Sequence, residues 1–222
     1  MTKQLLLIDG NSIVFRAFFA MHNQMDKFTN KDGLHTAAIY GFKLMLDHVL
    51  QNFKPDTALV AFDAGKVTFR TKMYDDYKGG RNKTPNELTE QIPYVRELIK
   101  DSGLHSYELA NYEADDIIGT LAKQADDAGY KTLIVTGDRD LTQLASENTT
   151  VAVTHKGVTD TEHYTPAHVE EKLGITPRQI IDMKALMGDS SDNYPGVTKI
   201  GEKTAIKLVK QFGSVEELYD HI

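Results

Sequence analysis

The sequence contains no cysteine. The chain therefore has no disulfide, no thiolate zinc site and no cysteine nucleophile, and a reducing compartment is permitted. Long apolar runs are also missing. The N-terminal apolar run, Leu5 to Ile8, stops at Asp9 and is far too short for a signal peptide or a membrane span. We therefore expect a cytoplasmic protein that does not associate with a membrane.

Basic residues are fewer than acidic ones. The chain has 25 Lys and Arg residues and 32 Asp and Glu residues, which gives a formal net charge of -7. This balance argues at first against a polyanionic partner, since phosphate binding depends on Lys and Arg. The basic residues nevertheless concentrate in two stretches, 66–83 and 199–210. A basic surface can therefore coexist with an acidic pocket. The 222 residues are enough for one large domain, alone or with a small appendage.

Short apolar runs bounded by turn residues predict three strands, within the stretches 4–12, 57–65 and 131–140. Apolar residues at helical spacing predict helices over 37–53 and 113–129. Apolar strands that alternate with helices indicate an α/β fold, with a mainly parallel sheet covered on both faces. In such sheets ligands bind beyond the carboxyl ends of the strands. Asp9, Asp63 and Asp138 all fall at such ends.

Seven acidic residues are expected at this one edge of the sheet: Asp9, Asp63, Glu113, Asp115, Asp116, Asp138 and Asp140. Without compensation they would oppose folding, so a hard divalent cation with oxygen ligands is the economical remedy. Magnesium or manganese fits better than zinc, because cysteine and paired histidines are missing. Simpler roles stay open for single residues. The acids near position 113 can serve the exposed N–H groups of a helix start, and Asp138 can be an N-cap with Asp140 as its solvated neighbour.

Basic and aromatic residues interleave in the stretch that follows Asp63, "KVTFRTKMYDDYKGGRNK". One interpretation is a flap over the acidic edge, in which Lys78 and Arg81 contact phosphate and Tyr77 stacks on a base. The other is an ordinary solvated loop and helix whose aromatic side chains pack inward. Composition alone slightly favours the second interpretation.

Glycines and lysines coincide near the C-terminus in "GVTKIGEKTA", which begins at Gly196. Gly196 and Gly201 flank a short hairpin, and a helix whose first turn holds Lys203 and Thr204 follows. Together they can form a backbone nest for a phosphate, with Lys199 and Lys207 close by. The alternative is a helical hairpin whose glycines serve only as caps. Asp189 and Asp192, just before this element, are either turn residues or further metal ligands.

Five motifs in order and spacing resemble the bacterial 5′-nuclease (flap endonuclease) family: "LIDGNS", "FDAG" followed by "YKGGR", "YEADD", "TGDRDLTQL" and "GDSSDNYPGVTKIGEKTA". The resemblance extends nearly from end to end and is strongest to 5′-3′ exonuclease domains that precede a DNA polymerase. It implies a PIN-like 5′-nuclease core over residues 1–172, which includes a basic arch segment at 66–100. It also implies a helix-hairpin-helix DNA-binding region over 173–222, truncated at its C-terminal end.

The resemblance implies hydrolysis of DNA phosphodiester bonds at 5′ flaps, nicks and 5′ ends, including RNA-primed ones, in replication and repair. It implies two or more Mg²⁺ or Mn²⁺ ions, and K⁺ at the helix-hairpin-helix element. The acids at the family's metal positions are Asp9, Asp63, Glu113, Asp115, Asp116, Asp138, Asp140, Asp189 and Asp192. The catalytic candidates are Lys78, Arg81, Asp63 and Asp116. The DNA-binding candidates are Arg70, Tyr77, Lys78, Arg81, Gly196, Lys199, Gly201, Lys203, Thr204 and Lys207. A monomer is expected, with a polymerase domain following in the same polypeptide.

Two other functions stay open at this point. One is a compact metal-dependent ribonuclease or phosphatase with acids at strand ends, which would not need the "GVTKIGEKTA" element. The other is a non-catalytic DNA-binding module descended from a nuclease, against which the complete acidic set argues. A flap nuclease would prefer branched DNA, whereas the ribonuclease or phosphatase would not. A flap nuclease would also cleave DNA in the presence of magnesium, whereas the binding module would not.

Overall fold

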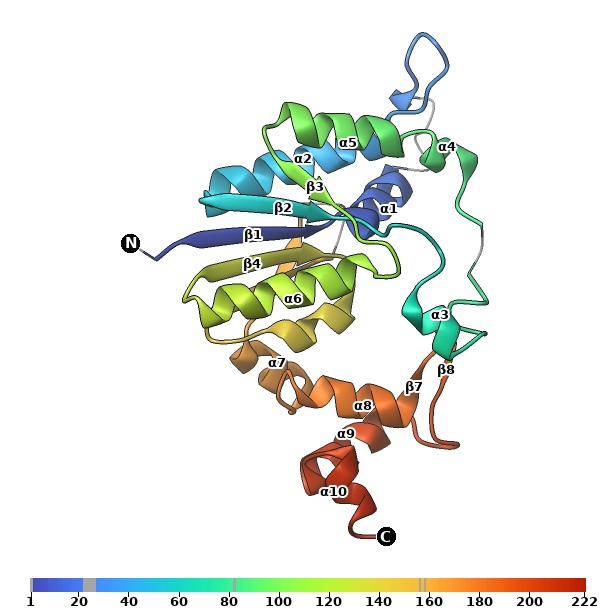
Figure 1. Cartoon of the computed structure of the whole chain (residues 1–222), viewed down its shortest axis with the longest axis vertical. Coiled ribbons are helices and arrows are strands. Elements are labelled where there is room, and N and C mark those ends of the chain that lie inside the picture. Colours follow the sequence, from blue (N-terminus) through green and yellow to red (C-terminus); the bar gives the residue numbers. More distant parts are fainter. Residues whose placement is uncertain (1, 22–26, 82, 156, 158) are drawn as a thin grey trace.

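The computed structural model describes residues 2–21, 27–81, 83–155, 157 and 159–222. Strands and helices alternate along the chain (Figure 1). The strands are β1 (Gln4–Asp9), β2 (Thr57–Ala61), β3 (His105–Tyr107), β4 (Lys131–Thr136), β5 (Thr149–Thr154), β6 (Thr161–Tyr164), β7 (Gly188–Asp189) and β8 (Tyr194–Pro195). The helices are α1 (Gly10–Met21), α2 (Ala37–Phe53), α3 (Phe69–Met73), α4 (Asn86–Thr89), α5 (Ile92–Asp101), α6 (Ala114–Asp127), α7 (Pro166–Leu173), α8 (Gln179–Met187), α9 (Glu202–Phe212), α10 (Val215–Tyr219) and the 3₁₀ helix η2 (Arg139–Leu144).

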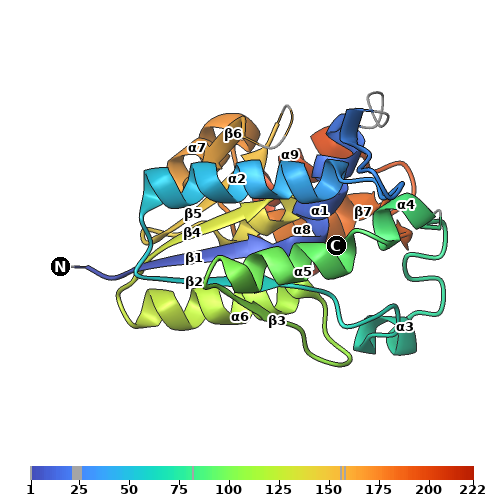
Figure 2. The same cartoon turned by 90° about the horizontal axis from the view of Figure 1, so that it is seen from above.

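Six strands form the central sheet in the order β3-β2-β1-β4-β5-β6. All neighbours pair in parallel except β5 and β6, which are antiparallel. Figures 1 and 2 show helices on both faces of this sheet. The predicted α/β fold with a mainly parallel sheet is therefore confirmed.

Side chains on β1 alternate between two cores, one on each face of the sheet. Leu6 and Ile8 face the core shared with α1, α2 and α5, whereas Leu7 faces the core shared with α6, α8 and α9. All three side chains are fully buried. A strand buried on both faces must be apolar at every position, which explains the continuous apolar run in the sequence.

The predicted elements match the structure closely where their apolar pattern is long. The helix expected over 37–53 is α2, and the helix expected over 113–129 is α6, which begins one residue after Glu113. β2 ends at Ala61, so Asp63 follows the strand as expected. The long excursion after Asp63 contains α3, α4 and α5, and α5 packs beside α2 (Figure 2).

The C-terminal helices α8, α9 and α10 lie below the sheet in Figure 1 and share its lower core. The α9 residues Ala205 and Val209 are buried in that core, which fixes the helix against α8. No helix in the described part of the chain is both long and apolar enough to cross a membrane.

Candidate active site

The carboxyl end of β1 places Asp9 at the centre of an acidic edge. Its side chain is 4% exposed. Asp9 Oδ1 accepts a hydrogen bond of 3.0 Å from the Ser12 amide, and Oδ2 accepts one of 2.8 Å from the Thr136 hydroxyl. Thr136 ends the neighbouring strand β4, so the two strand ends are joined through this carboxylate. Asp9 is the last residue of β1 and therefore lies at the edge where the strands end.

Asp63 connects the end of β2 to the start of α6. Its Oδ1 accepts a 2.8 Å hydrogen bond from the Ala114 amide, and its own amide donates to Asn11 Oδ1 at 3.1 Å. Asp138 is the N-cap of η2, and its Oδ1 accepts from the Asp140 amide at 2.8 Å. The capping role that the sequence left open for Asp138 is therefore present. One oxygen of Asp138 remains for another partner, so the cap does not exclude a metal.

Four of the nine predicted acids act on one another at this edge, and we call Asp9, Asp63, Asp115 and Asp138 the strand-end quartet. Burial, together with the charges of Asp63 and Asp138, raises the pKa of Asp9 to about 6. Burial also raises the pKa of Asp115 to about 8, with added repulsion from the other three. None of the four forms an ion pair with any Lys, Arg or His that the structure describes.

The quartet has the donor chemistry for a hard divalent cation, because it offers carboxylate oxygens whose mutual repulsion a cation would relieve. In the described ranges, however, no three acidic or histidine side chains already converge closely enough to hold an ion. Magnesium usually keeps several of its waters and takes only one or two carboxylates directly. The quartet therefore fits a metal held partly through water better than a closed cage of protein ligands.

Glu113 and Asp116 are paired with basic residues instead. The guanidinium of Arg70 donates to both oxygens of Asp116, at 2.7 and 2.8 Å. Lys78 Nζ lies 2.8 Å from Glu113 Oε2. Burial acts to raise the pKa of Asp116, but the bonds from Arg70 and the Glu113 amide and the charges of Arg70 and Lys78 together outweigh it, and this pKa is lowered. Asp116 also accepts from the Glu113 amide, so the two acids form the capping box of α6 that the sequence left open.

The third group of acids lies in the segment after α8. Lys184 Nζ is 2.8 Å from Asp140 Oδ1 and 2.8 Å from Asp189 Oδ2. Arg81 donates to Asp192 Oδ1 at 2.7 Å. The structure thus separates the nine predicted metal ligands into the unpaired quartet and five acids that protein cations already hold. Sequence reasoning did not find Lys184, and the signal that could have found it is a lysine inside the apolar run of α8.

The arch base, residues 74–81, is docked on the β7–β8 hairpin, residues 188–195. The Lys78 amide donates to the Asp192 carbonyl at 3.0 Å, and Asn193 Nδ2 donates to the Asp76 carbonyl at 2.9 Å. The rings of Tyr74 and Tyr194 stack with centroids 5.3 Å apart. Figures 1 and 2 show this region at the end of the sheet toward which the strands run. Residues far apart in sequence therefore form one wall beside the quartet.

Tyr77 lies inside this wall and not on its surface. The side chain is 5% exposed, and its hydroxyl donates to Glu113 Oε2 at 2.9 Å, with Asp192 Oδ2 at 3.2 Å. Burial, followed by the bond to Glu113, raises the pKa of Tyr77. A ring buried in this way cannot stack on a base, so the stacking role predicted for Tyr77 is wrong for this structure. The alternative, an aromatic residue packed inward, applies.

Most residues of the predicted phosphate nest lie in α9 or just before it, below the sheet (Figure 1). Gly201 is the N-cap of α9, and Lys203, Thr204 and Lys207 are exposed. Lys199 adopts a left-handed backbone with φ of 70°. None of these three lysines forms an ion pair with an acid that the structure describes.

Gly196 has a packing role that the sequence did not reveal. A Cβ on Gly196 would lie 2.2 Å from the Met187 carbonyl carbon, and one on Gly188 would lie 2.3 Å from the Gly196 nitrogen. Gly188 also has a φ of +76°. The backbones at the two ends of the β7–β8 hairpin therefore cross in contact, which only glycine permits.

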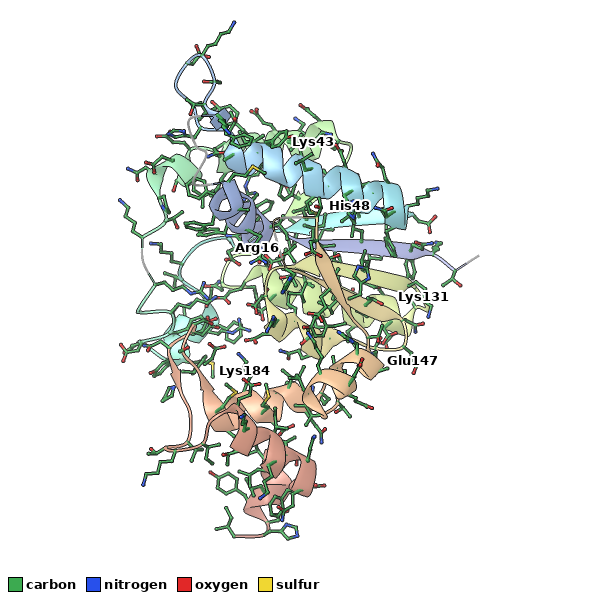
Figure 3. The ribbon with its side chains drawn as sticks, turned by 180° about the vertical axis from the view of Figure 1, so that it is seen from behind. Arg16, Lys43, His48, Lys131, Glu147 and Lys184 are labelled. Carbon is green, nitrogen blue, oxygen red and sulfur yellow. The ribbon has the colours of Figure 1, made fainter. Side chains whose placement is uncertain are left out.

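A cavity of about 350 Å³ lies between α2 and the strands β4 to β6, and Figure 3 labels three residues of its lining, His48, Lys131 and Glu147. None of the nine predicted acids lines this cavity. The acidic edge therefore lies outside this cavity.

Two family profiles together match almost the whole chain. Residues 4–174 match "5'-3' exonuclease, N-terminal resolvase-like domain", and residues 175–222 match "5'-3' exonuclease, C-terminal SAM fold". DNA polymerase I of Streptococcus pneumoniae strain R6 is 60% identical over 220 residues, and that of Bacillus subtilis is 59% identical over 220 residues. These matches cover 99% of this chain but 25% and 24% of the relatives. The chain thus spans about a quarter of the length of the curated relatives it matches.

Solved structures share the fold. A T5 5′-exonuclease structure with bound zinc has a TM-score of 0.79 at 23% identity, and the match covers 99% of this chain and 79% of that one. A T5 flap endonuclease complex with DNA and metal ions has a TM-score of 0.79 at 24% identity and the same coverage. Flap endonuclease-1 from Methanococcus jannaschii has a TM-score of 0.62 at 21% identity, with 99% and 74% coverage. The last two are named as flap endonucleases, and the two T5 structures contain metal ions.

Proposed function

Since the chain belongs to the 5′-3′ exonuclease family, as its motifs predicted, we propose that it cleaves DNA at 5′ ends, nicks and 5′ flaps, including RNA-primed ones. The observation that carries this proposal is the arch base with its basic residues beside an unpaired acidic quartet. Lys78 acts electrostatically on both Asp63 and Asp115, and Arg81 acts on Asp63. A negatively charged phosphodiester therefore has cationic side chains on one side and, on the other, acids that need a cation.

Mg²⁺ or Mn²⁺ is the proposed cofactor, with two or more ions bound. The strand-end quartet would hold one ion, and Asp140, Asp189 and Asp192 would take part in holding another. When bound, such ions would lower the pKa of an attacking water and offset charge on the leaving oxygen. Magnesium also occupies oxygen sites that keep several waters, which agrees with the finding that no three acids in the described ranges converge closely enough to hold an ion directly.

The residues of this chain position the cleaved bond. Asp9 is held by Ser12 and Thr136, so its carboxylate is oriented before any ligand binds. Lys78 and Arg81, now on Glu113 and Asp192, would exchange these carboxylates for phosphate oxygens of the substrate. Arg70 has a different role, because its fork to Asp116 fixes the start of α6 and with it Asp115. We therefore assign Arg70 and Asp116 to positioning and not to direct DNA contact.

The exposed face of α9 would bind duplex DNA. Lys203, Lys207 and Lys199 supply positive charge near the start of the helix, where free amides favour an anion. K⁺ bound at residues 196–201, which precede α9, belongs to this part of the proposal. The proposed protein is a monomer in the bacterial cytoplasm. It also carries a polymerase domain in the same polypeptide, since the relatives are about four times longer than this chain.

The test is incubation of the chain with an end-labelled 5′-flap duplex, with Mg²⁺ and with EDTA. Cleavage near the flap junction that requires Mg²⁺ supports the proposal. Faster cleavage of single-stranded RNA or of a small phosphate ester would instead identify a ribonuclease or a phosphatase. Flap binding without any Mg²⁺-dependent cleavage would identify a non-catalytic DNA-binding module.

A further inference from the structure

Lys184 bridges two acids from separate parts of the chain. It projects from α8, and its Nζ lies 2.8 Å from Asp140 in η2 and 2.8 Å from Asp189 in β7. The Lys184 side chain is 30% exposed, so the contact is partly shielded from water. Figure 3 labels Lys184 on α8, at the side of the molecule toward which the sheet strands run.

Both oxygens of Asp189 are occupied in this arrangement. Oδ1 accepts from the amide and the hydroxyl of Ser191, each at 2.7 Å. Oδ2 accepts from Lys184. A metal ion that approaches Oδ2 of Asp189 therefore meets the positive charge of the ammonium already bound there. The strand-end quartet differs, because no described Lys, Arg or His forms an ion pair with it.

One ammonium group carries half the charge of a divalent cation and satisfies both carboxylates through hydrogen bonds. It can thus keep Asp140 and Asp189 together in the absence of metal. The same contact opposes metal binding, because the ion must replace interactions that are already made.

We propose that Lys184 is an exchangeable counterion, which holds the Asp140–Asp189 pair in the metal-free protein and competes with the divalent cation for it. The inference rests on the proposed metal role of these two acids. It predicts two classes of metal site: a tighter one at the strand-end quartet, and a weaker one at Asp140 and Asp189 whose affinity Lys184 sets.

Direct titration of the whole chain with Mn²⁺, followed by the electron paramagnetic resonance of the free ion, tests this inference without DNA. Lys184→Met keeps the length of the side chain but removes its charge. It should tighten the weaker class by at least about 10-fold, because the contacts of the ammonium with the two carboxylates no longer have to be broken. The tighter class should not change. Lys184→Arg, which keeps the charge, should bind Mn²⁺ as weakly as the wild type.

Lys123→Met is the matched control, since Lys123 pairs with Asp127 on the exposed surface of α6 and should leave both classes unchanged. If Lys184→Met is poorly folded, Lys184→Gln is used, and the rise of melting temperature on adding Mn²⁺ should exceed that of the wild type. Unchanged or weaker Mn²⁺ binding in the neutral variants would overturn the inference. Because the readout is metal binding, a chain that binds Mn²⁺ in this way but cleaves no flap would refute only the proposed function.

Discussion

The guanidinium of Arg70 and the carboxylate of Asp116 form two parallel hydrogen bonds, 2.7 and 2.8 Å long, across 46 positions of sequence. The side chains are only 27% and 20% exposed. This pair joins α3, at the start of the arch region, to the first turn of α6. The position of Asp115, one residue before Asp116, therefore depends on a basic residue outside the acidic edge.

Arg70→Ala should destabilise the protein by about 2 kcal/mol, because it leaves Asp116 partly buried without its cation; solvent access keeps the cost below that of a fully buried pair. Urea unfolding measures this change. A double-mutant cycle with Asp116→Asn should show strong coupling. Arg81→Ala serves as the control, since Arg81 is 54% exposed and its pair with Asp192 should contribute at most about 0.5 kcal/mol. Additive effects of Arg70→Ala and Asp116→Asn would contradict the pairing.

Asp138→Asn should lower the single-turnover rate of flap cleavage by at least about 10²-fold, a typical loss when preorganised electrostatic stabilisation is removed. The amide oxygen of asparagine can still accept from the Asp140 amide, so the cap of η2 should survive. Melting in EDTA should show equal or higher stability, because one charge leaves a repulsive group. Asp127→Asn, on the exposed end of α6, is the control. Near-normal turnover at low Mg²⁺ would remove Asp138 from the metal ligands.

Lys78→Ala and Arg81→Ala should each lower the cleavage rate at saturating DNA more than they weaken DNA binding. The reason is that only interactions that strengthen in the transition state accelerate the chemical step. Single-turnover kinetics over a range of DNA concentrations separate the two effects. Arg81→Lys keeps the charge but loses the planar fork, so it should recover only part of the rate. Full cleavage rates at saturating DNA in both alanine variants would show that Lys78 and Arg81 contribute to DNA binding and not to the chemical step.

Lys203→Ala should weaken duplex binding and reduce the slope of log affinity against log salt by about 1, as expected for one lost phosphate contact. The rate at saturating DNA should change little, because α9 lies apart from the acidic edge (Figure 1). Fluorescence anisotropy at several salt concentrations gives the slope. Lys123→Ala, on α6, should leave it unchanged. An unaltered slope for Lys203→Ala would show that Lys203 on α9 does not contact a phosphate of the DNA.

His168 and Glu162 predict a pH dependence of stability on the α7 side of the sheet. The bond to Glu162 raises the pKa of His168, so this contribution is fully present below about pH 6.5 and is lost as pH rises through the raised pKa. The bonds from Lys172 and His168 lower the pKa of Glu162 to about 2, so that contribution is present above about pH 4.5 and is lost as pH falls. His168→Gln should therefore cost most stability between these limits, about 0.5 kcal/mol at this exposure. Urea unfolding from pH 4 to pH 9 tests it, with His163→Gln as control; a pH-independent difference would disprove it.

Local pattern was sufficient to predict the main elements of the fold. The continuous apolar run of β1 and the helical spacing of α2 report burial directly, because each residue's surroundings follow from its place in a regular element. β3 was not predicted, since its three residues are all exposed and carry no alternating or apolar signal. The strands β5 and β6 were missed as well, and only four residues define the antiparallel edge strand β6.

The composition of the acidic edge was predicted, but the partners of its members were not. The nine acids look alike in sequence, and their environments differ because cations arrive from distant positions, such as Arg81 at Asp192 across 111 residues. Long-range pairing of this kind leaves no local pattern. The partners of Tyr77 were missed for the same reason, since Glu113, which accepts from its hydroxyl, and its ring neighbour Tyr194 lie in other segments.

The contact between Gly188 and Gly196 closes the loop that carries Asp189 and Asp192 at its base. Closing a short loop at a fixed point removes most of its conformational freedom when the chain folds. The two carboxylates then lose little further entropy on meeting a ligand, which makes binding more favourable for the same contacts. A side chain at either glycine would reopen the loop, and the acids would become harder to order even though no charge had changed.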